Sequence, residues 1–156
     1  MTKRSESENI ICQNRKASHR FEILESLECG LVLTGTEVKS LRDKSVSIDE
    51  AYVRWEDAEL WLVGCHIAAY RFGTTASHEP LRQRKLLARA REIHRIRTKV
   101  EQKGMTLVPL KMYFNARGIA KVLIGLARGK KLHDRREDLK ARDHKREIER
   151  ALRKRR

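Results

Sequence analysis

The last 29 residues of the chain set the first limit on how it can fold. Residues 128–156 contain fourteen Lys/Arg and six Asp/Glu, a net charge of +8 out of +15 for all 156 residues. They include no Pro, Phe, Trp or Tyr and only a few aliphatic side chains. A segment of this composition cannot bury a core of its own. The folded domain must therefore come from the residues before it, and the charge of the tail predicts a polyanionic partner.

The preceding 127 residues are enough for one compact domain, and they are also basic, with 22 Lys/Arg and 15 Asp/Glu. Nucleic acid is a better polyanion than a membrane surface here, because the basic segments lack the apolar insertion face of an interfacial helix. The first residues have no apolar run typical of a secretory signal. No stretch is long and apolar enough to span a bilayer. We expect a cytoplasmic monomer with no membrane partner.

The three cysteines, Cys12, Cys29 and Cys65, are far apart in the sequence and form no CxxC pair. Free thiols are typical of a reducing cytosol, whereas a zinc site usually needs closely spaced ligands. The six histidines form no spaced ligand set, and no Gly-rich phosphate loop or nucleophile elbow is present. We expect no metal, no cofactor and no enzymatic activity.

Alternating apolar residues predict short strands and two hairpins. One hairpin would join its strands through a four-residue connection at 56–59, and the other would turn at 115–118. Pro109 cannot donate to a ladder, so its strand is expected at an edge or bulged there. A short helical turn is expected at 37–42. The expected strands lie within 21–36, with a break at 24–26, and at 51–55, 60–67, 106–114 and 119–127.

A long helix is predicted from Leu81 to Lys103, with Pro80 just before it and Gly104 just after it. Its apolar residues recur at three- and four-residue steps and would cover one end of a barrel. Between Arg82 and Lys103 it carries nine Lys/Arg against two acids. A solvated face is the usual fate of a charge run, but this imbalance favours contact with phosphates.

These elements predict a mainly β fold with flanking helices: a small closed or partly open antiparallel barrel of oligonucleotide-binding type. We place a flexible N-terminus at 1–12, an RNA-binding barrel domain at 13–127 and the basic tail at 128–156. Isolated helices of low apolar content are marginal, so we expect the tail to be disordered alone and helical when bound. The two tryptophans are assigned to the core, whereas Tyr52, Tyr70 and Tyr113 are left open between core and base stacking.

Four segments, in this order, resemble the SsrA-binding protein family, also called small protein B. Each motif alone is a weak match, but together they are highly specific, and the resemblance runs from about Asn14 to about Lys140. The segments are Asn14-Arg15-Lys16-Ala17, Gly35-Thr36-Glu37-Val38-Lys39-Ser40-Leu41-Arg42, Glu79-Pro80-Leu81-Arg82-Gln83-Arg84-Lys85-Leu86-Leu87, and Gly129-Lys130-Lys131-Leu132-His133-Asp134-Arg135-Arg136.

The resemblance implies a non-enzymatic RNA-binding protein with an oligonucleotide-binding barrel. The family binds the tRNA-like domain of transfer-messenger RNA and delivers it to stalled ribosomes for trans-translation. Its tail enters the empty decoding centre and mRNA channel of the small subunit and is helical there. The resemblance thus implies two partners, transfer-messenger RNA and the small-subunit rRNA of the ribosome.

Glu37 is the sharpest single site prediction. The family match implies that this glutamate is needed for binding transfer-messenger RNA, because a carboxylate can accept hydrogen bonds from bases or orient Lys39 or Arg42. From the residues alone, a capping or salt-bridging acid at a helix start is the more common case. The complete set of expected RNA-binding residues is Asn14, Arg15, Lys16, Glu37, Lys39, Arg42, Arg84, Lys85 and Lys121.

The tail signature is expected to bind the ribosome. Imidazole can stack on a base, and arginines can bind phosphates through two parallel hydrogen bonds. The family pattern is Asp-Lys-Arg, whereas this chain has Asp134-Arg135-Arg136, which keeps the charge but changes the geometry of the middle cation. The expected ribosome-binding residues are Lys130, Lys131, His133, Asp134, Arg135 and Arg136. Two rival classes stay open: a generic barrel protein that binds single-stranded nucleic acid, and an RNA-processing enzyme.

Overall fold

The computed structural model describes residues 9–73 and 77–154. The helices are α1 (Ala17–Arg20), α2 (Gly35–Arg42), α3 (Ala90–Lys103) and α4 (Leu132–Lys154). The strands are β1 (Asn9–Gln13), β2 (Phe21–Leu31), β3 (Val46–Ser47), β4 (Tyr52–Glu56), β5 (Glu59–Val63), β6 (His66–Ile67), β7 (Arg84–Leu87), β8 (Thr106–Phe114) and β9 (Ala120–Gly129). Among the described helices, none is both long and apolar enough to cross a membrane.

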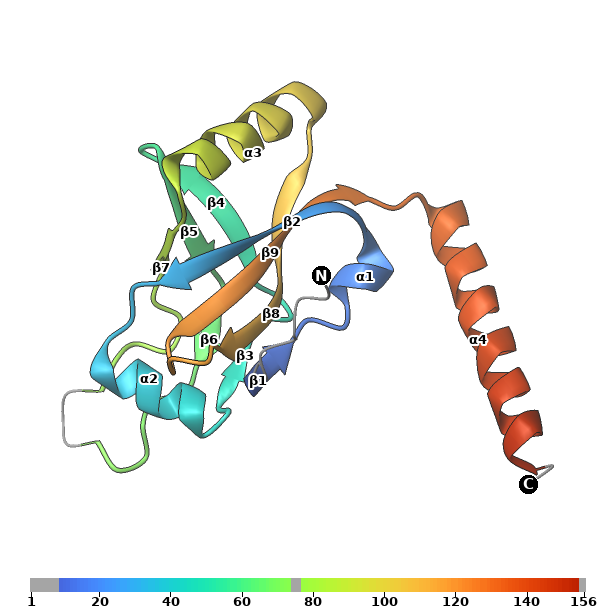
Figure 1. Ribbon diagram of the computed structural model, residues 1–156, viewed down its shortest axis with the longest axis horizontal. Helices are drawn as coiled ribbons and strands as arrows, with labels where there is room; N and C mark the ends of the chain where they lie inside the picture. The colour runs from blue at the N-terminus through green and yellow to red at the C-terminus, as the bar shows by residue number, and fades with distance from the viewer. Residues whose placement is uncertain (1–8, 74–76, 155–156) are drawn as a thin grey trace.

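Six strands close into an antiparallel barrel, which confirms the predicted fold class (Figure 1). The strand order is β1-β8-β4-β5-β7-β2-β9, and β9 pairs back onto β8 to close the ring, while β1 adds to β8 from outside. Two of the strand pairings are short. Strand β2 pairs with β7 at Gly30 and Leu31, and β4 pairs with β8 through Val53 and Leu107. Full closure leaves few free sheet edges.

Pro109 lies where its missing N–H predicts it. The register between β8 and β9 shifts between Pro109 and Lys111, which is the expected bulge. The same strand is not an edge, because it pairs with β1, β4 and β9 along its length. The predicted break in the first long strand is a second bulge, with a shift between Ile23 and Glu25, so β2 continues through it to Leu31.

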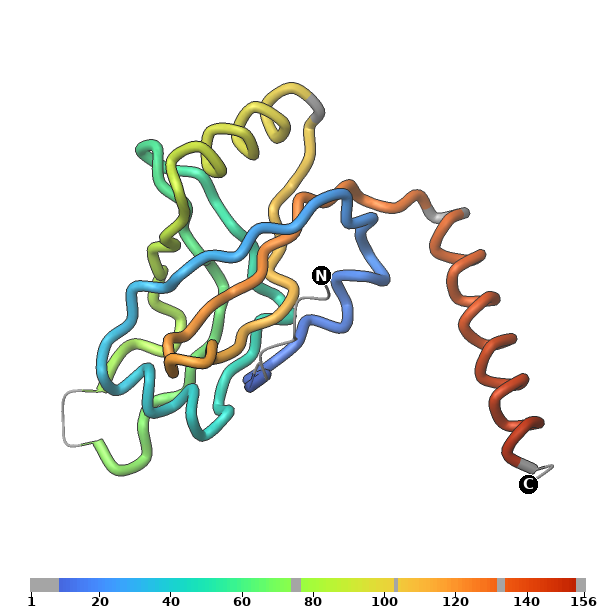
Figure 2. The backbone as a smooth tube through the Cα atoms, viewed as in Figure 1, coloured from blue at the N-terminus to red at the C-terminus, as the bar shows by residue number. Residues whose placement is uncertain are grey.

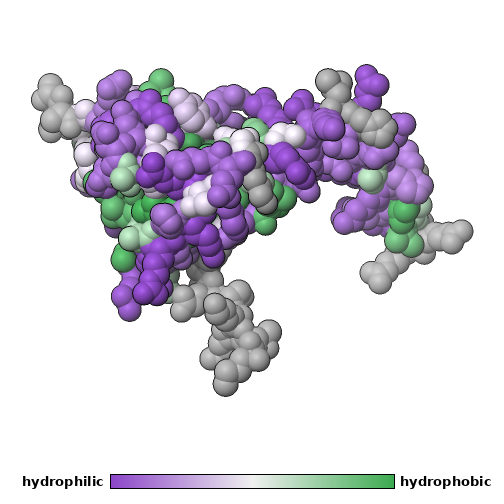
Figure 3. All heavy atoms as spheres, turned by 90° about the horizontal axis from the view of Figure 1, so that it is seen from above, coloured by the Kyte–Doolittle hydropathy of each residue, from purple (hydrophilic) through white to green (hydrophobic). Residues whose placement is uncertain are grey.

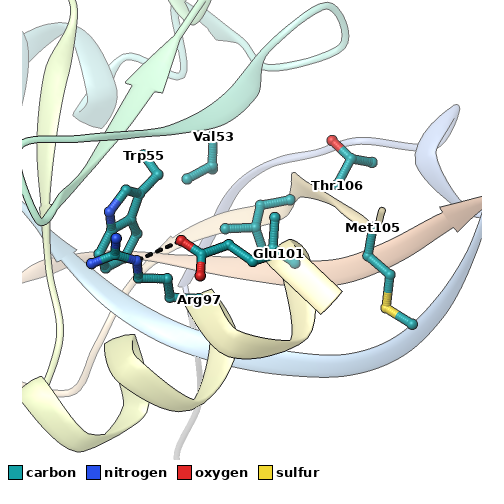
Figure 4. Close-up of a pocket in the computed structure, with 8 residues that line it drawn as sticks. Val53, Trp55, Arg97, Glu101, Met105 and Thr106 are labelled. Carbon is teal, nitrogen blue, oxygen red and sulfur yellow. Dashed lines mark hydrogen bonds and ion pairs between the residues drawn. The ribbon is translucent and has the colours of Figure 1, made fainter. Parts of the chain in front are cut away.

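Helix α3 covers one end of the barrel (Figure 1). Ile96 is buried in the core, and Ile93 and Val100 pack against it. Beside this contact a small pocket remains, where the Arg97 guanidinium lies over the Trp55 ring at 5.3 Å and donates to Glu101 at 2.7 Å (Figure 4). Both tryptophans are half-buried rather than interior, so their assignment to the core is only partly correct.

Three boundaries differ from the prediction. Residues 84–87 form strand β7, so the helix begins at Ala90 instead of Leu81. The first hairpin turns through two residues, Asp57 and Ala58, whose φ angles of 49° and 61° match the twist of the strands. Residues 9–12 of the expected flexible N-terminus belong to β1, paired to β8, whereas residues 1–8 lie outside the described part of the chain.

The tail projects from the barrel as the single long helix α4 (Figure 2). Disorder of the tail in the free protein stays a prediction, to be tested by backbone NMR of the free chain. The segment 132–154 contains no Gly or Pro, and acids precede cations by four residues at Asp138–Arg142 and Glu149–Arg153, a spacing that supports a helix. Its surface is mostly hydrophilic (Figure 3), and its apolar residues Leu139, Ile148 and Leu152 stay exposed, so helix formation does not bury a core.

Candidate nucleic-acid interface

A buried charge cluster lies beneath helix α2. Glu37, in the first turn of α2, and Arg84, on strand β7, are both 0% exposed. The Nε atom of Arg84 donates to Glu37 Oε1 at 2.9 Å. Arg82 donates to both carboxylate oxygens, from Nε at 3.1 Å and from Nη2 at 2.7 Å. The backbone N–H of Thr34 donates to Oε2 at 2.8 Å, so the same carboxylate also caps the helix.

The environment of Glu37 keeps its carboxylate charged. Burial alone would raise its pKa, but the hydrogen bonds from Arg82 and Thr34 and the charges of Arg84 and Arg82 outweigh it and lower the pKa below the ordinary value. All of these donors come from the protein. In this conformation Glu37 has no exposed surface with which to accept a hydrogen bond from a base. Its geometry fits the capping and ion-pairing alternative rather than direct base contact.

Arg84 is an interior support and not a surface cation. Besides Glu37, its guanidinium donates to the carbonyl oxygens of Cys65 and Arg82 at 2.8 Å each and to that of Pro80 at 3.2 Å. These bonds join α2, β7 and the segment before it into one unit. In this conformation Arg84 has no exposed group to offer RNA, because β7 alternates its side chains and turns Arg84 inward and Lys85 outward.

Asn14 is also structural in its geometry, with 8% of its surface exposed. Its Nδ2 donates to the carbonyls of Ile48 at 3.3 Å and Pro109 at 3.1 Å, and its Oδ1 accepts from the Ala17 N–H at 3.0 Å. These contacts hold the turn 14–17 against the bulge of β8. The side-chain amide of Asn14, which is expected to bind RNA, is thus bonded to the protein on both its nitrogen and its oxygen, whereas its neighbour Arg15 is exposed.

Replacing Asn14 with Ala should lower the free energy of unfolding by about 1–3 kcal/mol, because two buried carbonyls and one N–H lose their partner. Urea unfolding followed by circular dichroism measures the loss. Gln13→Ala, at an exposed position of β1, is the control and should change stability little. An Asn14→Ala protein as stable as the wild type would contradict the structural role.

The cations of the predicted set other than Arg84 lie on several elements, with Lys85 and Lys121 half-buried and the others exposed. Lys39 and Arg42 project from α2, Arg15 and Lys16 from the turn before α1, Lys85 from β7 and Lys121 from β9. Three of them are held by surface acids: Lys16 by Glu50 at 3.1 Å, Lys121 by Glu28 at 3.9 Å, and Lys85 by Glu59. Surface pairs of this kind are weak and exchange readily for phosphate.

The tail helix is fastened where it leaves the barrel. The Lys130 backbone N–H donates to the Arg20 carbonyl at 3.0 Å, its ammonium donates to the Ser18 carbonyl at 3.0 Å, and the same ammonium pairs with Asp138. Its side chain is only 17% exposed. This ion pair lowers the pKa of Asp138. Lys130 was expected to bind the ribosome, but its contacts join α1 to α4.

The other tail-signature residues lie at the start of α4. Lys131, Asp134 and Arg136 are exposed, and Arg135 is half-buried. The side chain of His133 lies outside the described residues, so its stacking on a base stays a prediction. Sequence reasoning missed the ion pair between Arg82 and Glu37. The sequence does contain a signal for it, because residues 82 and 84 lie on the same side of an extended chain and can meet the same acid. This signal is lost when 81–103 is treated as a helix.

The closed barrel with exposed cations and a basic helical arm defines a small basic barrel protein of oligonucleotide-binding type. The family model described as SmpB protein matches residues 11–154. The chain therefore belongs to the SmpB family. It is similar to the SsrA-binding protein of Chelativorans sp. (strain BNC1), with 53% identity over 93% of this chain and 94% of the relative. The SsrA-binding protein of Brucella canis is 54% identical over 97% and 96%.

A solved structure supports the same relationship. It is described as "tmRNA-SmpB: a journey to the center of the bacterial ribosome", and its matching chain superposes with a TM-score of 0.65 at 55% identity. The match covers 78% of this chain and 85% of that chain. The predicted family resemblance is thus confirmed.

Proposed function

We propose that this protein binds the tRNA-like domain of transfer-messenger RNA and delivers it to stalled ribosomes for trans-translation. The observation that carries the proposal is family membership over residues 11–154, with relatives named SsrA-binding proteins. The solved relative described together with tmRNA and the bacterial ribosome supports both partners. We infer a cytoplasmic, non-enzymatic protein that acts by binding alone.

In the barrel, the proposed RNA-binding groups are the exposed cations Arg15, Lys16, Lys39 and Arg42, together with the half-buried Lys85 and Lys121. They carry the electrostatic affinity for phosphates. The buried Glu37, Arg84 and Asn14 would act as positioning residues, because they fix α2 and the turn before α1 from which most of these cations project. If cations bind the RNA and buried residues position those cations, the glutamate at position 37 can be needed for RNA binding without touching RNA.

The tail would act on the ribosome and not on transfer-messenger RNA. Its helix extends away from the barrel (Figure 1), and it carries exposed cations along its length. We propose that it occupies the empty decoding centre and mRNA channel and contacts small-subunit rRNA. Lys130 would set the angle at which the helix leaves the barrel through its bonds to Ser18 and Asp138.

A competition experiment tests the proposal. A labelled transcript of the tRNA-like domain is bound to the full chain and displaced with unlabelled single-stranded RNA or an elongator tRNA. We expect at least roughly tenfold weaker binding of the competitors, and an affinity for every RNA that falls as salt rises. Equal affinity for all single strands would instead favour a generic single-strand-binding barrel, and cleavage of the transcript would favour an RNA-processing enzyme.

A further inference from the structure

A polar cleft of about 360 Å³ lies between the end of α2 and the chain that follows β6. Neither the buried Glu37 cluster nor the tail uses it. Its size suits a single nucleotide unit and not a helix or strand of a partner. The lining residues are Ser40, Asp43, Ser45, Ala68, Ala69, Tyr70, Arg71 and Phe72.

The α2 side of the cleft has polar groups without protein partners. Ser40 is 1% exposed, and its hydroxyl finds no hydrogen-bond partner among the described residues. That oxygen is itself covered by protein, so a ligand in the cleft does not reach it in this conformation. Asp43 lies three residues further along, and no described cation pairs with its carboxylate.

The position of Asp43 is unfavourable for the helix itself. It is the C-cap of α2, with φ −76° and ψ 0°, at the end where the helix dipole disfavours a negative charge. The next residue, Lys44, has a φ of 56°, which is rare for a side chain other than Gly or Asn. An acid in this position, in a chain of net charge +15, is more easily explained by a ligand than by helix stability.

The opposite side of the cleft is aromatic. Phe72 is 79% exposed, more than any other large apolar side chain that the structure describes. Its ring meets the ring of Tyr70 edge to face, with centroids 5.8 Å apart. A turn closed by the Gly73 N–H and the Tyr70 carbonyl at 3.1 Å brings the two rings together. An exposed ring supported by a second ring is a suitable platform for stacking a base.

Cations stand at the aromatic side of the cleft. The Lys39 ammonium lies 5.3 Å from the centroid of the Tyr70 ring and is exposed to solvent. Arg71 lies between the two aromatic residues in the sequence and is also exposed. A nucleotide whose base enters the cleft would therefore find cations near its phosphate.

We propose that the cleft binds one unpaired guanine of the bound RNA. This rests on the proposed function. The base stacks on Phe72, and its N1–H and N2–H donate to the two oxygens of Asp43. Guanine is the base with two adjacent donors on its Watson–Crick edge. Adenine has an acceptor at N1, which the carboxylate would repel.

The test uses the full chain and the tRNA-like transcript, with kethoxal as the probe, because it reacts with N1 and N2 of unpaired guanine. We expect the wild type to protect one unpaired guanine. Asp43→Asn and Phe72→Ala should restore its reactivity and weaken binding roughly tenfold, leaving other protections in place. Asp43→Asn relieves the unfavourable charge at the helix end, so it should fold normally. Asp57→Asn and Leu24→Ala, at exposed positions elsewhere, are the controls.

Several results would overturn the inference. One is that the wild type binds the tRNA-like transcript selectively, but the guanines react with kethoxal in the same way whether the wild type or a variant is bound. Another is protection at adenine or cytosine instead, seen with dimethyl sulfate. A wild type that binds the tRNA-like transcript no better than other RNAs would overturn the proposed function itself. The wild-type competition therefore separates the two failures before any variant is measured.

Discussion

Glu37→Ala should destabilise the barrel by about 3–5 kcal/mol, because it leaves the Arg84 guanidinium buried without its counter-charge. Domains of this size have total stabilities of about 5–15 kcal/mol, so much of the variant can be unfolded at 37 °C. Urea unfolding at pH 7 gives the loss. Binding of the tRNA-like transcript should weaken as well, since the strand and helix that carry Lys39, Arg42 and Lys85 lose their common support.

Two further variants separate this account from direct contact. Glu50→Ala removes an exposed acid that pairs with Lys16 and Arg20, and it should leave stability nearly unchanged. Adding Arg84→Met to Glu37→Ala should recover part of the lost stability, because the unpaired charge is gone. If Glu37→Ala proved as stable as the wild type and still lost RNA binding, the carboxylate would have to meet RNA directly, and the buried support would be refuted.

The triple change of Asp134, Arg135 and Arg136 to Ala should abolish tagging on stalled ribosomes and spare binding of transfer-messenger RNA. Loss of two charge-assisted phosphate contacts lowers affinity by roughly a hundredfold or more, whereas the barrel surface stays intact. Alanine is the best helix former, so α4 should persist. Tagging of a nascent chain in a reconstituted translation reaction and a gel-shift titration with the tRNA-like transcript measure the two effects.

The matched control lies nine to ten residues further along α4. Asp143, Lys145 and Arg146 are exposed and also comprise one acid and two cations, so their change to Ala alters the net charge equally. We expect this control to keep most of the tagging activity. Equal losses in both triple variants would show that only total charge matters in the tail. A collapse of transfer-messenger RNA affinity in the first variant would refute the separate roles of barrel and tail.

Much of the fold follows from local patterns. The second hairpin, the helical turn at α2 and the bulge at Pro109 depend on strand alternation, cap chemistry and a missing N–H, all of which act over a few residues. The assignment of 81–103 to a single helix was wrong because the stripe that runs through Ile93, Ile96 and Val100 appeared to extend back to Leu86. Leu86 is buried as a strand residue, paired with Leu60 and Leu31 on the two neighbouring strands β5 and β2.

Assigning 81–103 to one helix also changed the roles expected of neighbouring residues. On a helix, Arg84 and Lys85 would be adjacent surface cations, but on β7 one faces inward and the other outward. The burial of Asn14 was equally hidden, because its partners Ile48 and Pro109 are 34 and 95 residues away. Local sequence carries no record of such distant contacts, and a polar side chain looks the same whether it meets solvent or a buried carbonyl.

The sequence alone determined the basic character of the protein, the separation of barrel and tail, the barrel class and the family. These properties depend on composition, short-range periodicity and the order of motifs. Only the tertiary structure decided which charged and polar groups are free to bind a partner. Contacts within the protein hold the side chains of Glu37, Arg84, Asn14 and Lys130, while Lys39 and Arg42 remain exposed. The physical reason is burial: a charged or polar group withdrawn from water must bind partners, and closure of the barrel brings those partners together.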